Sequence, residues 1–180
     1  MAISTISSAG LATGGIGRSN MYTGAVLQVV STALTSATSY SVASGATQAI
    51  TGLSVSITPS SSTSKIMIFA SANISCQNVG GAIYLLRGST PIGVGDAAGS
   101  RTSVSSGSDS ATQNLYSETQ NPTIQFLDSP ATTSSTTYSV SLLNTRGSTD
   151  TMYVNRSIAD TNASNFGRYM SSITVMEIAA

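Results

Sequence analysis

Residues 51–76 read TGLSVSITPSSSTSKIMIFASANISC and carry the clearest structural signal in the chain. Leu53, Val55 and Ile57 alternate with serine and threonine, and a turn-like cluster of proline, serine and threonine follows them. Residues 65–76 then alternate in the same way. A period of two is typical of a β-strand with one buried face and one wet face. The stretch therefore predicts two consecutive strands joined by a turn.

The same alternation recurs along the rest of the chain, for example at Tyr138, Val140 and Leu142. Shorter candidate strands lie at residues 26–31, 48–51, 82–87, 123–127, 151–155 and 172–178. Turn-forming residues separate these runs, and no segment has the period of a helix. About ten short strands predict an all-β sandwich or barrel. Residues 94–122 are long and polar, so we expect a surface loop there, with one more short strand near 101–105.

The composition is poor in charge and rich in hydroxyl groups. Hydrophobic residues make up 40% of the 180 residues and charged residues only 8%, with seven basic and seven acidic side chains. No basic run is present, so binding to nucleic acid through phosphate neutralisation is not expected. No apolar run approaches the ~20 residues that span a bilayer, so no membrane association is expected either. A surface with so few charges lacks the repulsion that keeps monomers apart, which indicates an assembled protein.

Catalytic and metal-binding groups are scarce in this sequence. The chain has no histidine and a single cysteine, Cys76, so His-based nucleophilic catalysis and zinc binding are not expected. The carboxylates show no pairing of the kind that glycosidases need. The run DTNASN at 160–165 places oxygen-bearing side chains at alternate positions, which leaves a calcium ion near Asp160 open. We predict no catalytic residue and no cofactor.

The first twenty residues differ from the rest of the chain. They combine glycine and serine with a few isolated large apolar side chains, and cannot form a core of their own. We interpret residues 1–20 as a docking arm whose apolar residues are buried by a partner. These anchors are Ile3, Ile6, Leu11 and Ile16.

The last predicted strand, SSITVMEIAA at 171–180, is apolar on both faces. Ile173, Val175 and Glu177 share one face, and the alternate residues form the other. We predict that Ile173, Val175 and Glu177 lie at a subunit interface, where a buried carboxylate needs a partner. The basic candidates for that partner are Arg87, Arg156 and Arg168.

Several segments together resemble a domain of virion structural proteins in tailed phages of cyanobacteria and other aquatic bacteria. These are GAVLQVVS (24–31), TGLSVSITPSSSTSKIMI (51–68), LLRGSTPIGVGDA (85–97), FLDSPATTSSTTYSV (126–140), YVNRS (153–157) and FGRYMSSITVMEI (166–178). By strand order the chain is also similar to the trimeric jelly rolls of the C1q and tumour-necrosis-factor type. The resemblance implies a jelly-roll-like β-sandwich over residues 21–180, which forms a homotrimer and has no catalytic residues.

The resemblance also implies a place on the virion surface. Because the sequence has no long shaft, heptads or repeats, we expect a head decoration or cement protein that binds the major capsid protein through its arm. The alternative is a short tail fibre or spike that binds a host glycan or surface receptor. In that case the polar loop, with Arg101 and Tyr116, is the expected contact region.

Overall fold

The computed structural model describes residues 21–77, 81–108 and 119–180. These residues form twelve strands and no helix, which confirms the all-β prediction. Every strand pair is antiparallel. The predicted arm, with Ile3, Ile6, Leu11 and Ile16, lies outside the described residues.

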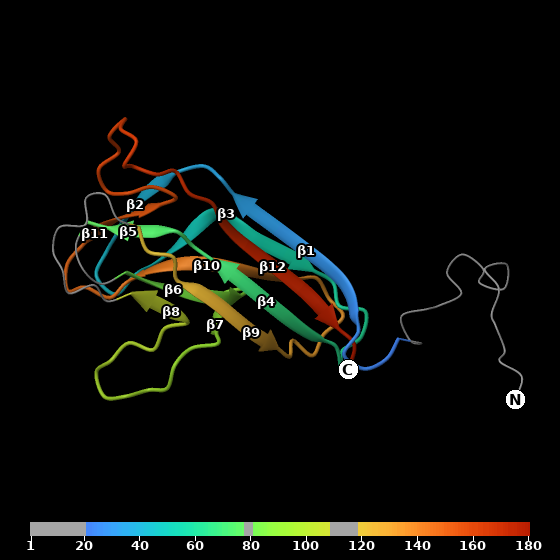
Figure 1. The fold of residues 1–180 in the computed structure, drawn as a ribbon. Helices are drawn as coiled ribbons and strands as arrows, with labels where there is room; N and C mark the ends of the chain where they lie inside the picture. The colour runs from blue at the N-terminus through green and yellow to red at the C-terminus, as the bar shows by residue number, and fades with distance from the viewer. Residues whose placement is uncertain (1–20, 78–80, 109–118) are drawn as a thin grey trace, which may run out of the picture.

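Two larger sheets form the layers of a jelly-roll-like β-sandwich (Figure 1). The order of strands in the first sheet is β1 (Val26–Leu34), β12 (Ser171–Ile178), β4 (Lys65–Ser71) and β9 (Thr123–Asp128). The order in the second is β3 (Thr47–Ile57), β10 (Thr136–Asn144), β6 (Gly81–Arg87) and β7 (Thr90–Ile92), with β8 (Ser106–Ser108) also paired to β6. A third sheet contains β2 (Thr38–Val42), β11 (Asp150–Val154) and β5 (Ile74–Cys76).

The core lies between the two larger sheets, where each strand contributes its inward row. Leu53, Ile66, Ile83, Leu142 and Ile173 are among the side chains with no exposed surface. Fully burying one such side chain stabilises a fold by roughly 1.5–3 kcal/mol. The period of two in residues 51–76 thus positions the core as predicted, because its apolar members Leu53 and Ile66 face the opposite sheet.

The third sheet continues the first one across a bend. β1 leads into β2 through residues 35–37, and β4 leads into β5 through residues 72–73. Asn155 lies at this joint, immediately after β11, and has a positive φ of 60°. At the bend, its side chain takes the place of hydrogen bonds that neighbouring strands would otherwise make with each other. The amide Nδ2 donates to the carbonyl oxygens of Leu34 (2.7 Å) and Ser36 (3.0 Å), and Oδ1 accepts from Ser171 Oγ (2.6 Å).

Some strand boundaries differ from the prediction for identifiable reasons. Residues 48–51 and 53–57 form one strand, β3, because Gly52 adopts a φ of +84° and lets the strand continue through an irregular position. Residues 65–76 form two strands, β4 and β5, because the layer bends between them. The extra strand in the polar loop is β8, which lies a few residues after the predicted 101–105. β2 and β7 were not predicted, since each is short and mostly polar.

Candidate functional site

The outer face of the sheet β1–β12–β4–β9 carries a continuous line of apolar side chains. Val29 pairs with Met176, Met176 with Met67, and Met67 with Leu127. Cross-strand partners share one face of a sheet, so these four residues form one row across all four strands. We call them the apolar row. Val29 is 54% exposed and Leu127 is 53% exposed, while the two methionines are half-buried.

The surroundings of the apolar row are also poor in charge. Exposed Val26 and Phe69 lie on the same face, on either side of the row. Beside Phe69, on β12 and β1, the face carries small hydroxyl side chains, including the bonded pair Thr174 and Ser31, whose hydroxyl oxygens are 2.7 Å apart. Among the described residues of this face, Lys65 at one end is the only charged side chain. An exposed apolar patch of this kind is a candidate for contact with another surface.

The predicted interface residues lie on the opposite face of β12. Ile173, Val175 and Glu177 have no exposed surface and point into the core of their own chain, so the prediction that they lie at a subunit interface is wrong. Both faces of this strand are apolar, and alternation by itself does not say which of two apolar faces is inward. The face left for a partner is that of Thr174, Met176 and Ile178.

Glu177 is held in a cage of uncharged donors. Its Oε1 accepts from the backbone N–H of Ser60 (2.7 Å), from Ser60 Oγ (2.5 Å) and from Ser64 Oγ (2.8 Å). Its Oε2 accepts from Gln28 Nε2 (2.6 Å). Burial raises the pKa of the carboxyl group, but the hydrogen bonds from Ser60, Gln28 and Ser64 outweigh it and lower the pKa to about 2. The group is therefore a structural carboxylate that ties β12 to β1 and to the turn after β3.

The three arginines predicted as partners of Glu177 pair with other carboxylates. Arg87 Nη1 lies 2.9 Å from Asp128 Oδ1, whereas Arg156 and Arg168 both pair with Asp160. The prediction is wrong because spacing in the sequence does not show which strand ends meet. Arg156 and Arg168 lie before the start of β12, while Glu177 lies near its end.

Asp128 forms a buried polar network with residues of the second sheet. It accepts two hydrogen bonds from Arg87 Nη1, at 2.9 and 3.0 Å, and one from the hydroxyl of Tyr138 at 2.7 Å. Burial and the hydrogen bond to Asp128 raise the pKa of Tyr138 far above its ordinary value. Since β9 belongs to one layer and β6 and β10 to the other, this network links the two sheets.

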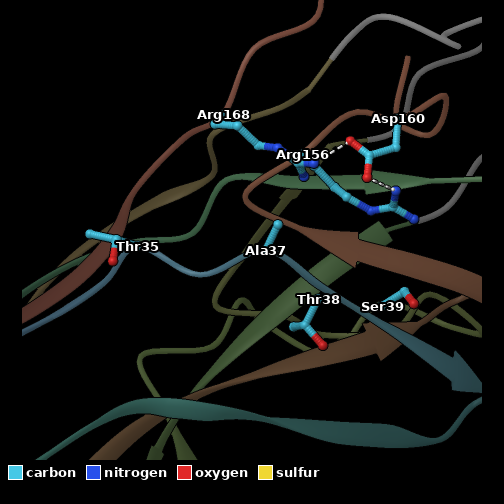
Figure 2. A pocket seen from close by; sticks show the side chains of 7 residues that line it. All are labelled: Thr35, Ala37, Thr38, Ser39, Arg156, Asp160 and Arg168. Atoms are coloured by element: carbon cyan, nitrogen blue, oxygen red, sulfur yellow. Dashed lines mark ion pairs between the residues drawn. The ribbon is translucent and has the colours of Figure 1, made fainter. Parts of the chain in front are cut away.

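Asp160 lies between two guanidinium groups at the rim of a surface hollow, which we call the arginine hollow (Figure 2). The residues that line it are Thr35, Ala37, Thr38, Ser39, Arg156, Asp160 and Arg168. Asp160 Oδ2 is 2.9 Å from Arg156 Nη1, and its Oδ1 is 2.6 Å from Arg168 Nη2. The hydrogen bond from Arg168 and the charges of both arginines hold the pKa of Asp160 below its ordinary value. Two positive charges at the carboxylate oppose a calcium ion there, and no cluster of three metal-ligating side chains occurs in the described part of the chain.

Cys76 shows no sign of reactivity. Burial, with the nearby Asp150 carboxylate, raises the pKa of its thiol to about 12, so the nucleophilic thiolate is scarcely populated near neutral pH. Its sulfur also fills the space where a side chain at Gly81 would project. The thiol is thus a packing group between β5 and β6.

The predicted receptor loop is only partly described. Arg101 is exposed and folds back onto its own loop, with Nη1 3.3 Å from the carbonyl oxygen of Ala98. Tyr116 lies outside the described residues. Among residues 21–77, 81–108 and 119–180, no helix is long and apolar enough to cross a membrane.

The chain matches no protein-family model, and a search of the curated proteins found no match. The functional argument therefore rests on the surface itself. Sequence reasoning missed the apolar row and the arginine hollow. Met67 and Phe69, two large apolar residues at outward positions of the 65–76 alternation, were the signal for the row.

Proposed function

We propose that this protein is a non-enzymatic structural subunit of a phage virion, which forms homotrimers through the apolar row and decorates the particle surface. The assignment to a phage virion comes from the resemblance of the sequence segments. The observation that carries self-association is the exposed row Val29–Met176–Met67–Leu127 on an almost uncharged sheet face. Such a face gains free energy when it is covered, at roughly 25 cal/mol for each Å² of apolar surface removed from water.

A second copy of the same chain is the occupant that fits this face. Identical faces that carry like charges repel each other, but on this face Lys65, at the edge, is the only charged side chain among the described residues. In a closed symmetric oligomer, every copy then presents this same face towards the symmetry axis. That the oligomer has three subunits is inferred from the resemblance to trimeric jelly rolls and to phage fibre domains.

Replacing one residue of the apolar row with a charge should break the trimer. We expect light scattering to give a mass three times the 18.2 kDa of one chain for the wild type, and a much smaller mass for Leu127→Glu. The carboxylate would be desolvated at the interface without a partner. Ser54→Glu is the matched control, because Ser54 is exposed on a strand of the other sheet.

Two results would contradict this interface. One is a monodisperse wild-type monomer at micromolar concentration, and the other is a Leu127→Glu variant that keeps the wild-type mass. If residues 1–20 of the same chain cover the row instead, the wild type is a monomer and the variant lacking residues 2–19 self-associates.

Attachment to the particle is assigned to the arm. The described chain begins next to the end of β12, where the N–H of Gly24 donates to the carbonyl oxygen of Ala179 at 2.7 Å. The segments that line the arginine hollow are the start of β2 and the loop between β11 and β12. They lie at the other end of the sandwich (Figure 1). A partner bound through residues 1–20, most simply the major capsid protein, would leave the far end directed outward.

Deletion of residues 2–19 should separate folding from attachment. We expect a folded trimer with an unchanged melting temperature that no longer binds particles lacking their own copies of the protein. The three arms of a trimer bind the particle together, so their weak contacts add up to strong attachment. Deleting all three arms should therefore abolish binding rather than weaken it slightly. A truncated form that still saturates the particles, or that unfolds several degrees earlier, would overturn the docking role.

The alternative function is a short tail fibre or spike that binds a host glycan, and the arginine hollow is the observation that favours it. Quantitative mass spectrometry of purified particles separates the two functions. A head decoration protein repeats with the capsid lattice and is present in hundreds of copies, whereas a fibre is present in a few to tens.

A further inference from the structure

The hollow near the start of β12 has the features of a small binding site. It has a volume of about 580 Å³, within the range of roughly 300–1,000 Å³ typical of ligand pockets. Arg156, Arg168 and Asp160 form one side, and the start of β2 forms the other (Figure 2). The remaining lining residues are Thr35, Ala37, Thr38 and Ser39.

The hollow carries one net positive charge. Asp160 neutralises one of the two guanidinium groups, and it approaches a single nitrogen of each, Nη1 of Arg156 and Nη2 of Arg168. A guanidinium group has five N–H donors, so donors of both arginines remain for a ligand. Arg156 is held in place because its guanidinium lies 4.5 Å from the centre of the Tyr153 ring, and its side chain is 19% exposed. Arg168 is 58% exposed and accessible.

The two walls of the hollow are fixed to each other by Asn155. Its side chain holds the carbonyl oxygens of Leu34 and Ser36, next to the Thr35 wall, while its own backbone continues into Arg156. Its carbonyl oxygen also accepts from the N–H of Tyr169 at 3.1 Å, which places the segment that carries Arg168. Asn155 is itself buried and has a positive φ, a backbone conformation that asparagine adopts more readily than most residues.

We propose that this hollow binds the carboxylate of an acidic sugar, such as a uronic acid. A guanidinium group matches a planar carboxylate through two parallel hydrogen bonds. Thr35, Thr38 and Ser39 also line the hollow, and their hydroxyl groups have no hydrogen-bond partner within the described residues, so they offer donors and acceptors to the hydroxyl groups of a sugar ring. The methyl group of Ala37 adds a small apolar contact for ring C–H groups.

A polyanion is a poorer fit to this surface. The hollow has a single unpaired positive charge, and the chain has zero net charge, so there is no extended basic track for nucleic acid. The lining residues can neutralise one carboxylate and form hydrogen bonds with a few hydroxyl groups. The inference does not rest on the proposed function, because the lining residues belong to one chain and a monomer would bind equally well.

A titration of the isotope-labelled full chain, followed by amide NMR shifts, tests the site. Glucuronate and glucose share one ring and differ only at the carboxylate. We expect glucuronate to shift the amides of residues 35–39 and 156–168, and glucose to leave them unchanged. Arg168→Ala should weaken glucuronate binding by at least about tenfold. Arg101→Ala is the matched control, since Arg101 is an exposed arginine outside the hollow, and its affinity should equal that of the wild type.

Three results would overturn the proposal. Equal shifts with glucose would show that the carboxylate is not recognised. Acetate or inorganic sulfate binding as tightly as glucuronate would show a site for small anions rather than for a sugar. The absence of shifts in these two segments at every glucuronate concentration would show that the hollow is not a sugar site at all. Because Arg168 is exposed, its alanine variant keeps the fold, which its unchanged NMR spectrum without ligand would verify.

Discussion

Replacing Asn155 with alanine should destabilise the folded protein by about 4 kcal/mol, a loss few single substitutions reach. Asn155 is completely buried, and its amide group satisfies two backbone carbonyls and one hydroxyl group. Alanine leaves these groups without their partner, at about 1–3 kcal/mol for each one that stays buried. The left-handed backbone conformation costs alanine roughly a further 1–2 kcal/mol, whereas asparagine tolerates it. The carbonyl groups of Leu34 and Ser36 are only part-buried, so water can hydrate them in the variant. The expected loss of stability is therefore smaller than the sum of these contributions.

Two further variants separate the contributions at this position. Asn155→Gly relieves the backbone conformation and should recover about 1 kcal/mol relative to alanine. Asn155→Asp keeps the shape but places a negative oxygen against the carbonyls of Leu34 and Ser36, so it should be at least as destabilising as alanine. Urea unfolding at one fixed protein concentration measures all three, because an oligomer's stability depends on concentration. A loss below about 1 kcal/mol for Asn155→Ala would show that the joint does not depend on this side chain.

The sequence predicts the layers of this fold better than it predicts their joint. Period-two alternation over residues 51–57 and 65–76 identifies strands and their inward rows, since burial of one face is a local property of the chain. The bend that separates β4 from β5 is held by residues that are distant in the sequence. The N–H of Asn155 donates to the carbonyl oxygen of Asn73, and the N–H of Asn73 donates to Ser171 Oγ. No pattern in the sequence around Asn155 distinguishes it as the residue that holds this joint.

The candidate sites were harder to predict than the fold. Alternation shows that β12 is apolar on both faces, but the inward face is decided by the sheet that packs on it. The apolar row exists only once β1, β12, β4 and β9 are aligned in register. The pairing of Arg156 and Arg168 with Asp160 likewise depends on how a loop returns to the start of β12. The sequence did show correctly that Glu177 is an exceptional carboxylate, because it sits in an otherwise apolar strand.

Glu177→Gln should remove a large part of the acid sensitivity of this protein. The pKa of the folded carboxyl group is about 2, below its ordinary 4.5. A lowered pKa stabilises the fold fully above about pH 4.5, and this contribution is lost as the pH falls from 4.5 towards 2. The difference of about 2.5 pKa units corresponds to about 3 kcal/mol. Glutamine has no charge to lose, so the variant lacks this part of the pH dependence.

The difference between the two stability curves isolates Glu177 from the other carboxylates, Asp128 and Asp160 included. At pH 7, Glu177→Gln should be less stable than the wild type by about 2–3 kcal/mol. Whichever way the new amide is turned, its N–H₂ group replaces an oxygen that accepted hydrogen bonds from Ser60 and Ser64 or from Gln28. These donors then lose their acceptor. Near pH 2.5 the stabilities of the two proteins should approach each other, because the carboxyl group of the unfolded wild type is protonated there and most of the stabilisation from its lowered pKa is lost. Urea unfolding between pH 2.5 and pH 7 measures the difference. A variant that follows the wild-type curve in parallel over this range would show that Glu177 does not titrate as its hydrogen bonds require, and that the cage stabilises the charge far less than its geometry indicates.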